Sequence, residues 1–399
     1  MAGPFNWLSQ VISVSLFNVR TLPQRIGSSL TAVLGVAGVV AVMVAVLSIA
    51  HGILRAMESS SAPENVIVLR SGATAEMMSA LIGDEVDYIS EAPGIARNED
   101  GAIASAELFV IIDVKMKTTG TDANVPLRGV SRAAPAVHQD FNIIEGRMFE
   151  WGLNELVVGV GASAEFKGLS VGDSIEVARE QWPIVGMFEA GGGIAESEIW
   201  VDAAVLQPAY RRGNSYQSVY AKLESPDRFQ EFKDALTADP RLNVRPIREE
   251  EYYAEQSEML YNLVTGLGLL IAVIMGFGAV FGALNTMYTA VAARAREIAT
   301  LRALGFHSGP VVISVLIESL LLALAGGVIG AGLAWLIFDG FSASTLNFAS
   351  FSQVTFAFFV STQLLVQGIL FAMVIGFFGG LFPAVRAARM PVADALREQ

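Results

Sequence analysis

The chain has 399 residues, of which 53% are apolar and 16% are charged, and its mean hydropathy is +0.51. Soluble domains carry about 25% charged residues, so this composition excludes an ordinary water-soluble globule. The chain contains no cysteine. Disulfides, thiolate metal sites and thiol nucleophiles are therefore excluded as well.

Four long apolar stretches predict membrane spans. Three of them contain no Asp, Glu, Lys or Arg, namely Ile26–Leu54, Met259–Ala293 and Gly340–Val385. The fourth, Val311–Phe338, contains a single acid. Each is longer than the ~20 residues that a helix needs to cross a bilayer. Because Ser59–Glu258 has no such run, we expect a membrane α-helical protein of four spans, with one large aqueous domain between the first and second.

Charge predicts the topology. Residues 51–258 hold 18 Lys and Arg against 34 Asp and Glu, a net of −16, and the rest of the chain holds 8 against 5, a net of +3. The eight basic residues flank the spans at Arg20, Arg25, Arg294, Arg296, Arg302, Arg386, Arg389 and Arg397. Positive flanks are cytoplasmic, whereas long translocated domains escape this rule. Both termini are therefore expected on the cytoplasmic side of the membrane, with residues 55–255 on the opposite side.

The segment before the first span has the pattern of an amphipathic helix. Its apolar residues recur at helical spacing, at Phe5, Leu8, Ile12, Leu16 and Val19. This pattern fits a helix on the inner leaflet of the membrane and equally a helix packed on the bundle. Pro23 is expected to end it. The first span, at 29 residues, is longer than the apolar region of a signal peptide, so we expect it to remain uncleaved.

The aqueous domain alternates short β-like runs with brief helical ones, which predicts an α+β fold. The β-like runs are NVIVLR from Asn65, ELFVIIDVKM from Glu107, ELVVGV from Glu155, SIEV from Ser174, PIVGMF from Pro183, EIWV from Glu198 and SVYAKL from Ser218. Helices are expected at Ala75–Ile82 and Pro226–Ala238. From Glu249 to Leu263 a stalk helix is expected to continue into the second span and carry motion, the simpler alternative being a passive tether.

Catalytic groups are sparse. The three histidines, His51, His138 and His307, fall in different predicted compartments and offer no metal cluster. The sequence has no G-x-x-x-x-G-K-[ST] motif, so this chain is not expected to hydrolyse ATP through a P-loop of its own. No nucleic-acid partner is indicated. We expect a non-catalytic subunit without catalytic, metal-binding or cofactor-binding residues.

Small and polar residues inside the spans suggest helix contacts. Three glycine pairs are spaced four apart, at Gly278 and Gly282, Gly326 and Gly330, and Gly376 and Gly380. Such pairs allow close helix approach, although glycine is also simply common in membrane helices. The acid in the third span, Glu318, is expected to face the bundle and bond a neighbouring helix, or else to snorkel to the cytoplasmic boundary.

A short helix is predicted between the second and third spans. Ile298, Leu301 and Leu304 recur every third position. Glu297 near the start and Arg302 near the end suit the helix dipole, and a glycine follows, Gly305, which can close the helix in the left-handed conformation. From composition alone, a plain connector whose arginines only enforce topology is an equal alternative.

Asn285–Gly332, NTMYTAVAARAREIATLRALGFHSGPVVISVLIESLLLALAGGVIGAG, resembles the core signature of MacB/FtsX-like ABC transporter permeases. LFNVRTLPQRIGSSLTAVLGVAGV before and within the first span, and PAVRAARMPVADALRE at Pro383–Glu398, resemble further parts of that family. NIIEGRMFEWGLNELVVGVGASAEFKGLSVGDSIEV looks like the MacB-type periplasmic core domain. The resemblance covers nearly the whole chain and is weakest at residues 73–104 and 207–217.

The resemblance implies a four-span permease that dimerises, as a homodimer or a paralogous heterodimer, and transmits ATP-driven motion to its periplasmic domain. In MacB the ATPase is fused at the N-terminus. With 25 residues before the first span here, a separate cytoplasmic ATPase that carries ATP and Mg is expected. REIATLRALG matches the family's coupling element, so the expected ATPase-coupling residues are Arg294, Arg296, Glu297, Ile298, Leu301, Arg302, Leu304 and Gly305. Ile298 and Leu301 are expected to enter a groove of the ATPase, while the arginines pair with its acids or with lipid phosphates.

These arguments predict the following organisation: 1–25 cytoplasmic amphipathic helix, 26–54 first span, 55–255 periplasmic core domain, 256–290 stalk and second span, 291–309 cytoplasmic coupling loop, 310–338 third span, 339–356 short periplasmic loop, 357–385 fourth span, 386–399 cytoplasmic tail.

The leading function is export or extraction of an amphiphilic substrate, such as a drug, peptide or lipoprotein, with a periplasmic adaptor as a further partner to test. The main alternative is a non-transporting mechanical regulator of cell-wall hydrolases. A sensor receptor would need a cytoplasmic output module, and an intramembrane enzyme would need paired catalytic groups.

Overall fold

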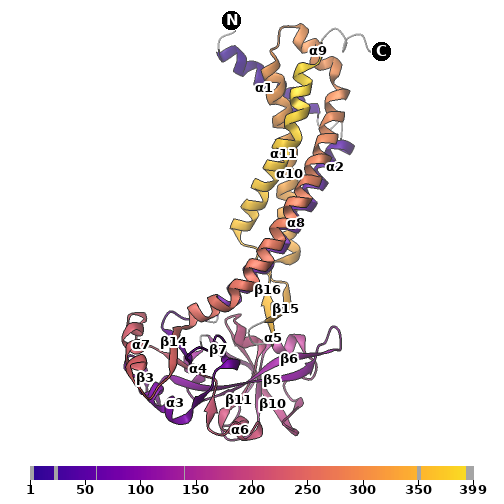
Figure 1. Ribbon diagram of the computed structural model, residues 1–399. Helices are drawn as coiled ribbons and strands as arrows, with labels where there is room; N and C mark the ends of the chain where they lie inside the picture. Colours follow the sequence, from indigo (N-terminus) through magenta and orange to yellow (C-terminus); the bar gives the residue numbers. More distant parts are fainter. Residues whose placement is uncertain (1–3, 22–25, 60, 139, 348–351, 392–399) are drawn as a thin grey trace. The chain divides into compact units, whose positions relative to one another are not determined.

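A computed structural model describes the chain except residues 1–3, 22–25, 60, 139, 348–351 and 392–399 (Figure 1). The chain forms two compact units. The helical bundle comprises Met1–His51, Leu263–Asp339 and Phe359–Gln399, and the α+β domain comprises Gly52–Asn262 and Gly340–Phe358. The predicted stop at Pro23 and most of the predicted tail lie outside the described residues.

The bundle is built from long apolar helices. The helices that contribute to it are α1 (Pro4–Thr21), α2 (Ile26–Glu58), α8 (Glu249–Ala293), α9 (Ala295–Ala303), α10 (Ser308–Phe338) and α11 (Thr362–Arg389). Four segments are long and apolar enough to cross a membrane, namely Ser29–Met57, Leu260–Ala293, Ser308–Phe338 and Thr362–Arg389. The expected four-span fold class is confirmed. Since α8 is a single helix, the predicted stalk belongs to the same helix as the second span.

Glycine lets the bundle helices approach closely. A Cβ atom at Gly330 of α10 would collide with backbone atoms of Ala37 in α2, and one at Gly326 would lie 2.7 Å from the carbonyl oxygen of Val33. In α11, a Cβ at Gly380 would lie 2.6 Å from Ser319 Cβ of α10. Gly376 faces the same helix, at Ala323. A Cβ atom at Gly278 or Gly282 of α8 would have no atom of another described element within 4 Å. This pair of glycines therefore does not contact a neighbouring helix of the described chain.

Helix α1 packs on α10 along one side only. Val11 and Val14 are buried, whereas Leu8, Ile12 and Leu16 are each about half exposed, at 51–53%. The helix therefore lies on the bundle and still presents an apolar stripe outward. The expected packing on the bundle is therefore observed, and contact with the inner leaflet stays a prediction.

The α+β domain is organised around one ten-stranded sheet with the order β14-β1-β13-β5-β6-β11-β8-β10-β7, and β9 pairs with β10. Its strands are β1 (Asn65–Arg70), β5 (Ala104–Lys115), β6 (Asp122–Val130), β7 (Phe141–Gly146), β8 (Leu156–Gly159), β9 (Ser174–Val177), β10 (Glu180–Ala190), β11 (Ile199–Asp202), β13 (Ser218–Lys222) and β14 (Val244–Arg248). Short pairs form beside it from β2 (Leu81–Ile82) with β12 (Ser215–Tyr216), and from β3 (Arg97–Asn98) with β4 (Gly101–Ala102).

Strand β5 joins two lobes of this sheet. Its first residues, Ala104–Glu107, pair with β13, and Leu108–Lys115 pair with β6. Each lobe has its own core, one including Phe232 and the other including Trp182, both fully buried. The domain's other helices are η2 (Glu76–Met78), α3 (Gly83–Ser90), α4 (Ala134–Val137), α5 (Val160–Glu165), η3 (Ile194–Ser197), α6 (Ala203–Ala209), η4 (Pro226–Arg228) and α7 (Phe229–Ala238).

The predicted β-like runs all coincide with strands, and Pro226–Ala238 is helical as expected. The helix expected over Ala75–Ile82 is wrong. That segment forms one 3₁₀ turn at Glu76–Met78 and then strand β2, because Glu76 turns inward to an arginine and Leu81 pairs with Tyr216 of β12.

The connection between α10 and α11, expected as a short loop over 339–356, is a β-hairpin of β15 (Ser342–Asn347) and β16 (Ser352–Ala357). The hairpin belongs to the α+β domain, where the Thr355 amide donates a hydrogen bond to Ser197 Oγ at 2.8 Å. Helix α11 accordingly begins at Thr362 rather than at residue 357. Two hairpin side chains, Val354 and Phe356, are buried.

Candidate functional site

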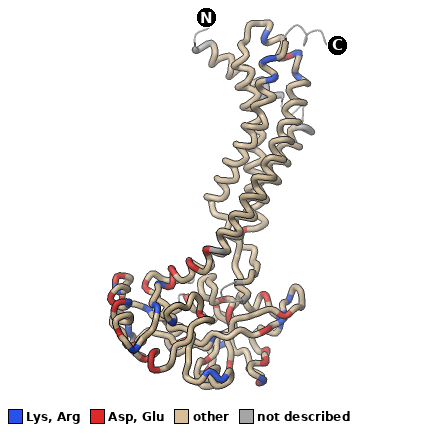
Figure 2. Tube along the Cα trace, in the orientation of Figure 1, with Lys and Arg blue, Asp and Glu red and all other residues tan. Residues whose placement is uncertain are grey.

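The α8–α9–α10 corner of the bundle is the candidate site. Helix α8 ends at Ala293, and Arg294 follows with φ −108° and ψ 10°, which interrupts the helix before α9. Figure 2 shows basic residues gathered at this end of the bundle. The nine-residue helix α9 therefore connects two long helices, α8 and α10. Part of its surface is accessible to an external partner.

Helix α9 is closed by a Schellman motif. Gly305 has φ +97°, and its amide donates to the Arg302 carbonyl at 3.1 Å. The Phe306 amide donates to the Leu301 carbonyl, also at 3.1 Å. Glu297 lies in the first turn and Arg302 in the last, which suits the helix dipole. The capped helix expected from the sequence is present in the structure.

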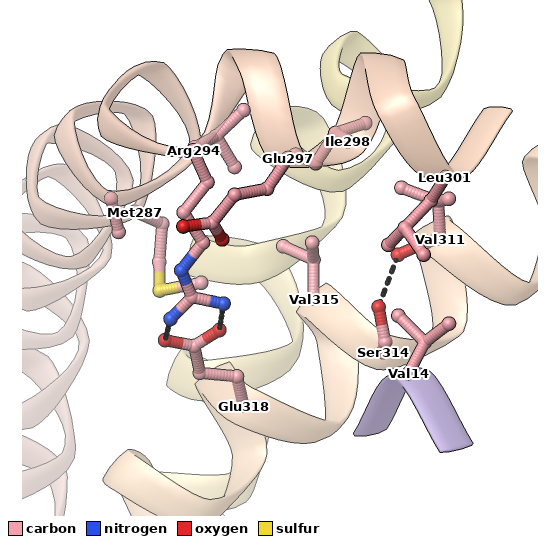
Figure 3. A pocket seen from close by; sticks show the side chains of 12 residues that line it. Val14, Met287, Arg294, Glu297, Ile298, Leu301, Val311, Ser314, Val315 and Glu318 are labelled. Carbon is pink, nitrogen blue, oxygen red and sulfur yellow. Dashed lines mark hydrogen bonds and ion pairs between the residues drawn. The ribbon is translucent and has the colours of Figure 1, made fainter. Parts of the chain in front are cut away.

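Arg294 and Glu318 form a buried ion pair in this corner (Figure 3). Arg294 Nη1 donates to Glu318 Oε2 at 3.0 Å, and Nη2 donates to Oε1 at 2.8 Å. Both side chains are 4% exposed. Glu318 therefore faces the bundle, and the pair joins the start of α9 to α10.

Two of the expected coupling residues are buried in this chain. Ile298 is 8% exposed and packs in a cluster that draws on four helices. The members of that cluster are Met287, Val291, Ile298, Val311, Val315, Ala384 and Ala387. Ile298 and Arg294 were expected to contact a partner, but both point into the bundle. A short helix across the end of a bundle must turn its most apolar side inward, because that side covers the ends of the other helices.

The outward side of α9 carries the remaining expected residues. Leu304 is 74% exposed, and Arg296 and Glu297 are exposed as well. Arg302 is partly buried and donates from Nη1 to the Met390 carbonyl beyond α11. An open groove between α1 and α9 is lined by Ser13, Val14, Arg296, Glu297, Thr300, Leu301 and Phe306. The corner thus offers an apolar groove edged by charge.

A second group of charged residues, not anticipated from the sequence, lies inside the α+β domain. Arg128 of β6 uses all five guanidinium donors. It binds Glu198 at 2.6 and 2.7 Å, Glu76 at 2.8 and 3.0 Å, and Glu107 at 2.9 Å. Arg128 is 3% exposed and Glu107 is fully buried. The sequence places a charged residue among apolar ones in each of two strands, Glu107 in β5 and Arg128 in β6. It does not show that they form a network, because the other acids that bind Arg128 are far away along the chain.

His138 extends this network. Its Nε2 lies 2.9 Å from Glu107 Oε1. Burial by itself raises the pKa of Glu107, but His138 and Arg128 bring it below its usual value. Burial lowers the pKa of His138, but Glu107 raises it above its usual value. His138 is therefore a structural residue of the ion network.

Glu249, the first residue of α8, interacts electrostatically with His138 of the network. It is fully buried, and Asn65 Nδ2 donates to its Oε2 at 2.9 Å. Burial raises the pKa of Glu249 to about 7, against the lowering effect of His138. Tyr252, one turn along α8, is 2% exposed, and its hydroxyl accepts a bond from the Glu76 amide at 3.3 Å. The foot of α8 is therefore anchored on the charged core of the domain.

The other histidines, His51 and His307, lie in α2 and just before α10. Among the described residues, no group of three or more His, Cys, Asp or Glu could hold a metal ion.

Comparison with known families matches two models to the chain. The MacB-like periplasmic core domain matches residues 29–239, and the FtsX-like permease C-terminal domain matches residues 269–392. The first match covers the α+β domain up to α7, and the second covers α9, α10 and α11. The α9 corner thus lies inside the permease match.

Two relatives of this chain are also named as permease proteins. The chain is 26% identical to the macrolide export ATP-binding/permease protein MacB of Chlorobium luteolum, over 92% of this chain and 57% of that protein. It is 25% identical to the uncharacterized ABC transporter permease YknZ of Bacillus subtilis, over 57% of each chain. The chain thus spans 57% of the length of these two relatives.

Two solved structures are similar to parts of the chain. The extracellular domain of YknZ from Gram-positive bacteria has a TM-score of 0.35 at 13% identity, covering 46% of this chain and 100% of that chain. The periplasmic region of MacB from Actinobacillus actinomycetemcomitans has a TM-score of 0.37 at 10% identity, covering 50% and 94%. With one family model covering more than half of the sequence and a second covering the permease part, the chain belongs to the MacB/FtsX-like ABC transporter permeases.

Proposed function

We propose that this chain is the non-catalytic membrane subunit of a bacterial ABC transporter, and that it couples ATP hydrolysis by a separate cytoplasmic ATPase to movement of its α+β domain. The observation that carries the proposal is α9. It is a capped helix at the basic end of the bundle, with Leu304 74% exposed and Leu301 in the lining of an apolar groove. The MacB relative, named as an ATP-binding/permease protein, supports an ATPase partner.

The α+β domain is the working part in this proposal. Helix α8 runs without a break from Glu249 to Ala293, and its first residues are anchored by the buried contacts of Glu249 and Tyr252. The substrate class is an amphiphile, such as a drug, peptide or lipoprotein, that is exported or extracted at the outer face of the inner membrane. The charge distribution supports this orientation.

A second permease copy belongs to the same proposal. Gly278 and Gly282 leave one face of α8 open, and such faces allow another helix to approach closely. Co-purification from native membranes separates the remaining possibilities. An ATPase with a periplasmic adaptor favours transport, whereas a cell-wall hydrolase favours the mechanical regulator.

The docking role of α9 is tested by the double substitution Leu301→Asp with Leu304→Asp. Burying a leucine side chain in a partner contributes ~1.5–3 kcal/mol, and 1.4 kcal/mol is a tenfold change in affinity. We expect co-purification of the ATPase to fall at least ~10-fold, while the permease inserts in normal amount. Leu153→Asp, at a leucine of the α+β domain that is 47% exposed, is the matched control. Wild-type ATPase stoichiometry in the double variant would show that α9 is not the docking element.

A further inference from the structure

Arg294 separates α8 from α9 and also forms the buried ion pair with Glu318 of α10. Arg294 precedes α9 and has the non-helical dihedrals at the break. Its guanidinium is bonded to Glu318 through both Nη atoms. A rotation of α9 about this break therefore pulls directly on the ion pair.

One donor of Arg294 is not used in this arrangement. Its Nε is buried without a hydrogen-bond partner among the described residues. The pocket around it is lined by two acids, Glu318 of α10 and Glu297 of α9. Figure 3 shows the Glu297 side chain reaching from α9 to the Nε side of Arg294, opposite Glu318. A guanidinium can bind a carboxylate through that side as well, because its five donors form a fixed fork.

The physical cost of breaking the pair explains why a second acid matters. A buried ion pair that loses one partner leaves an uncompensated charge in a low-dielectric surrounding, which is strongly unfavourable. Arg294 can leave Glu318 readily only if another carboxylate receives it. Of the residues that line the pocket, Glu297 is the one acid besides Glu318, and it moves with α9.

We propose that Arg294 is a positioning residue with two acceptors, which holds Glu318 of α10 in the resting bundle and passes to Glu297 when a partner displaces α9. When Arg294 changes its acceptor from Glu318 to Glu297, α9 is no longer held to α10 by the ion pair. Displacement of α9 and release of α10 therefore occur together. The inference about the two acceptors stands on the corner geometry, and its use in coupling rests on the proposed docking of the ATPase at α9.

The test uses the absence of cysteine from the chain. Ile298→Cys places a thiol at a position that is 8% exposed, and its rate of maleimide labelling in membranes without ATPase reports loosening of α9. Thr300→Cys, on the exposed side of the same helix, is the control for reagent access. We expect Glu318→Gln to raise labelling of Ile298→Cys at least fivefold and to leave Thr300→Cys unchanged.

The decisive result is the non-additivity of two substitutions. In the resting chain Glu297→Gln is expected to leave labelling of Ile298→Cys unchanged. In the Glu318→Gln background it is expected to raise labelling at least threefold further, because Arg294 has then lost both acceptors. Additive effects, or no effect of Glu318→Gln, would overturn the proposal. If Glu318→Gln does not accumulate in the membrane, the same cycle is measured with Glu318→Asp, whose shorter side chain draws the carboxylate away from Arg294.

A second arm adds the co-purified ATPase with a non-hydrolysable ATP analogue. Labelling of Ile298→Cys is expected to rise in an otherwise wild-type chain and to stay low with Glu297→Gln. No response to the ATPase, together with the expected result in the partner-free cycle, would contradict docking at α9 and leave the two-acceptor arrangement standing. The two failures are therefore distinguishable.

Discussion

At the scale of single residues, two groups of buried charges in the described part of the chain are each centred on one arginine. The Arg128 network in the α+β domain pairs one guanidinium with three carboxylates, and the Arg294–Glu318 pair ties α9 to α10. In both, the arginine is at most 4% exposed. Because a buried charge is stable only with its partners in place, each group fixes the relative position of the elements that supply it.

Glu249 should make the stability of the α+β domain depend on pH. Its pKa is raised from 4.5 to about 7 by burial, so the folded state binds the proton more tightly than the unfolded chain. That contribution to stability is complete below pH 4.5 and is lost as pH rises through 7. The difference of 2.5 pH units corresponds to at most about 3 kcal/mol.

We therefore expect Glu249→Gln to match the wild type near pH 5 and to unfold at a higher temperature than the wild type at pH 8. Thermal unfolding of the purified full chain is followed by the fluorescence of the buried Trp182 and Trp200. Glu250→Gln, at the exposed neighbouring position, should follow the wild type at every pH. Equal curves for Glu249→Gln and Glu250→Gln would contradict this assignment.

At the scale of elements, packing of the bundle depends on where glycine stands relative to the neighbouring helix. Gly330 lies against the backbone of Ala37, whereas Gly278, spaced in the same way from its own partner glycine, has no atom of another described element within 4 Å. The same four-residue spacing therefore marks a helix contact inside the bundle in one case and an open face in the other.

Gly330→Val should destabilise the bundle, because the added carbons collide with backbone atoms that cannot move aside. Overpacking of this kind costs ~1–3 kcal/mol. Gly278→Val is the matched control and is expected to leave the unfolding temperature of the monomeric chain in detergent unchanged. The assignment of the α2–α10 contact would be wrong if both variants unfolded at the same temperature as the wild type.

At the scale of the whole molecule, the chain passes between its two units at residues 51–52, 262–263, 339–340 and 358–359. Three separate segments thus connect with the α+β domain, namely the end of α2, the foot of α8, and the β15–β16 hairpin. The hairpin is bonded to Ser197, next in sequence to Glu198 of the Arg128 network. The hairpin is therefore a further covalent connection between the bundle helices α10 and α11 and the domain, besides α2 and α8.

The topology of the whole chain is tested by single-cysteine labelling of intact cells, since the natural chain has no cysteine to remove. Asp227→Cys, exposed in the α+β domain, should react with a membrane-impermeant maleimide before the inner membrane is permeabilised. Thr300→Cys on α9 should react only afterwards. The opposite pattern would invert the proposed orientation and place α9 out of reach of a cytoplasmic ATPase.

Features that depend on local pattern could be predicted from the sequence. The four apolar stretches predict the spans, because a helix satisfies the hydrogen bonds of its own backbone in a bilayer. Alternating and β-branched runs such as Asn65–Arg70 set the strands, and the spacing of Ile298, Leu301 and Gly305 set a short capped helix. These features require only neighbours along the chain.

Contacts between distant residues could not be predicted from local pattern. The local sequence around Glu76 predicts a helix, yet the Glu76 carboxylate binds Arg128, 52 residues away. Ile298 was expected on the surface, since periodicity defines one face of α9 without saying whether that face turns inward. Arg294 and Glu318 lie 24 residues apart, and only the antiparallel return of α10 brings them together. Long-range pairs of this kind are fixed by packing and by the cost of burying charge, which no local pattern records.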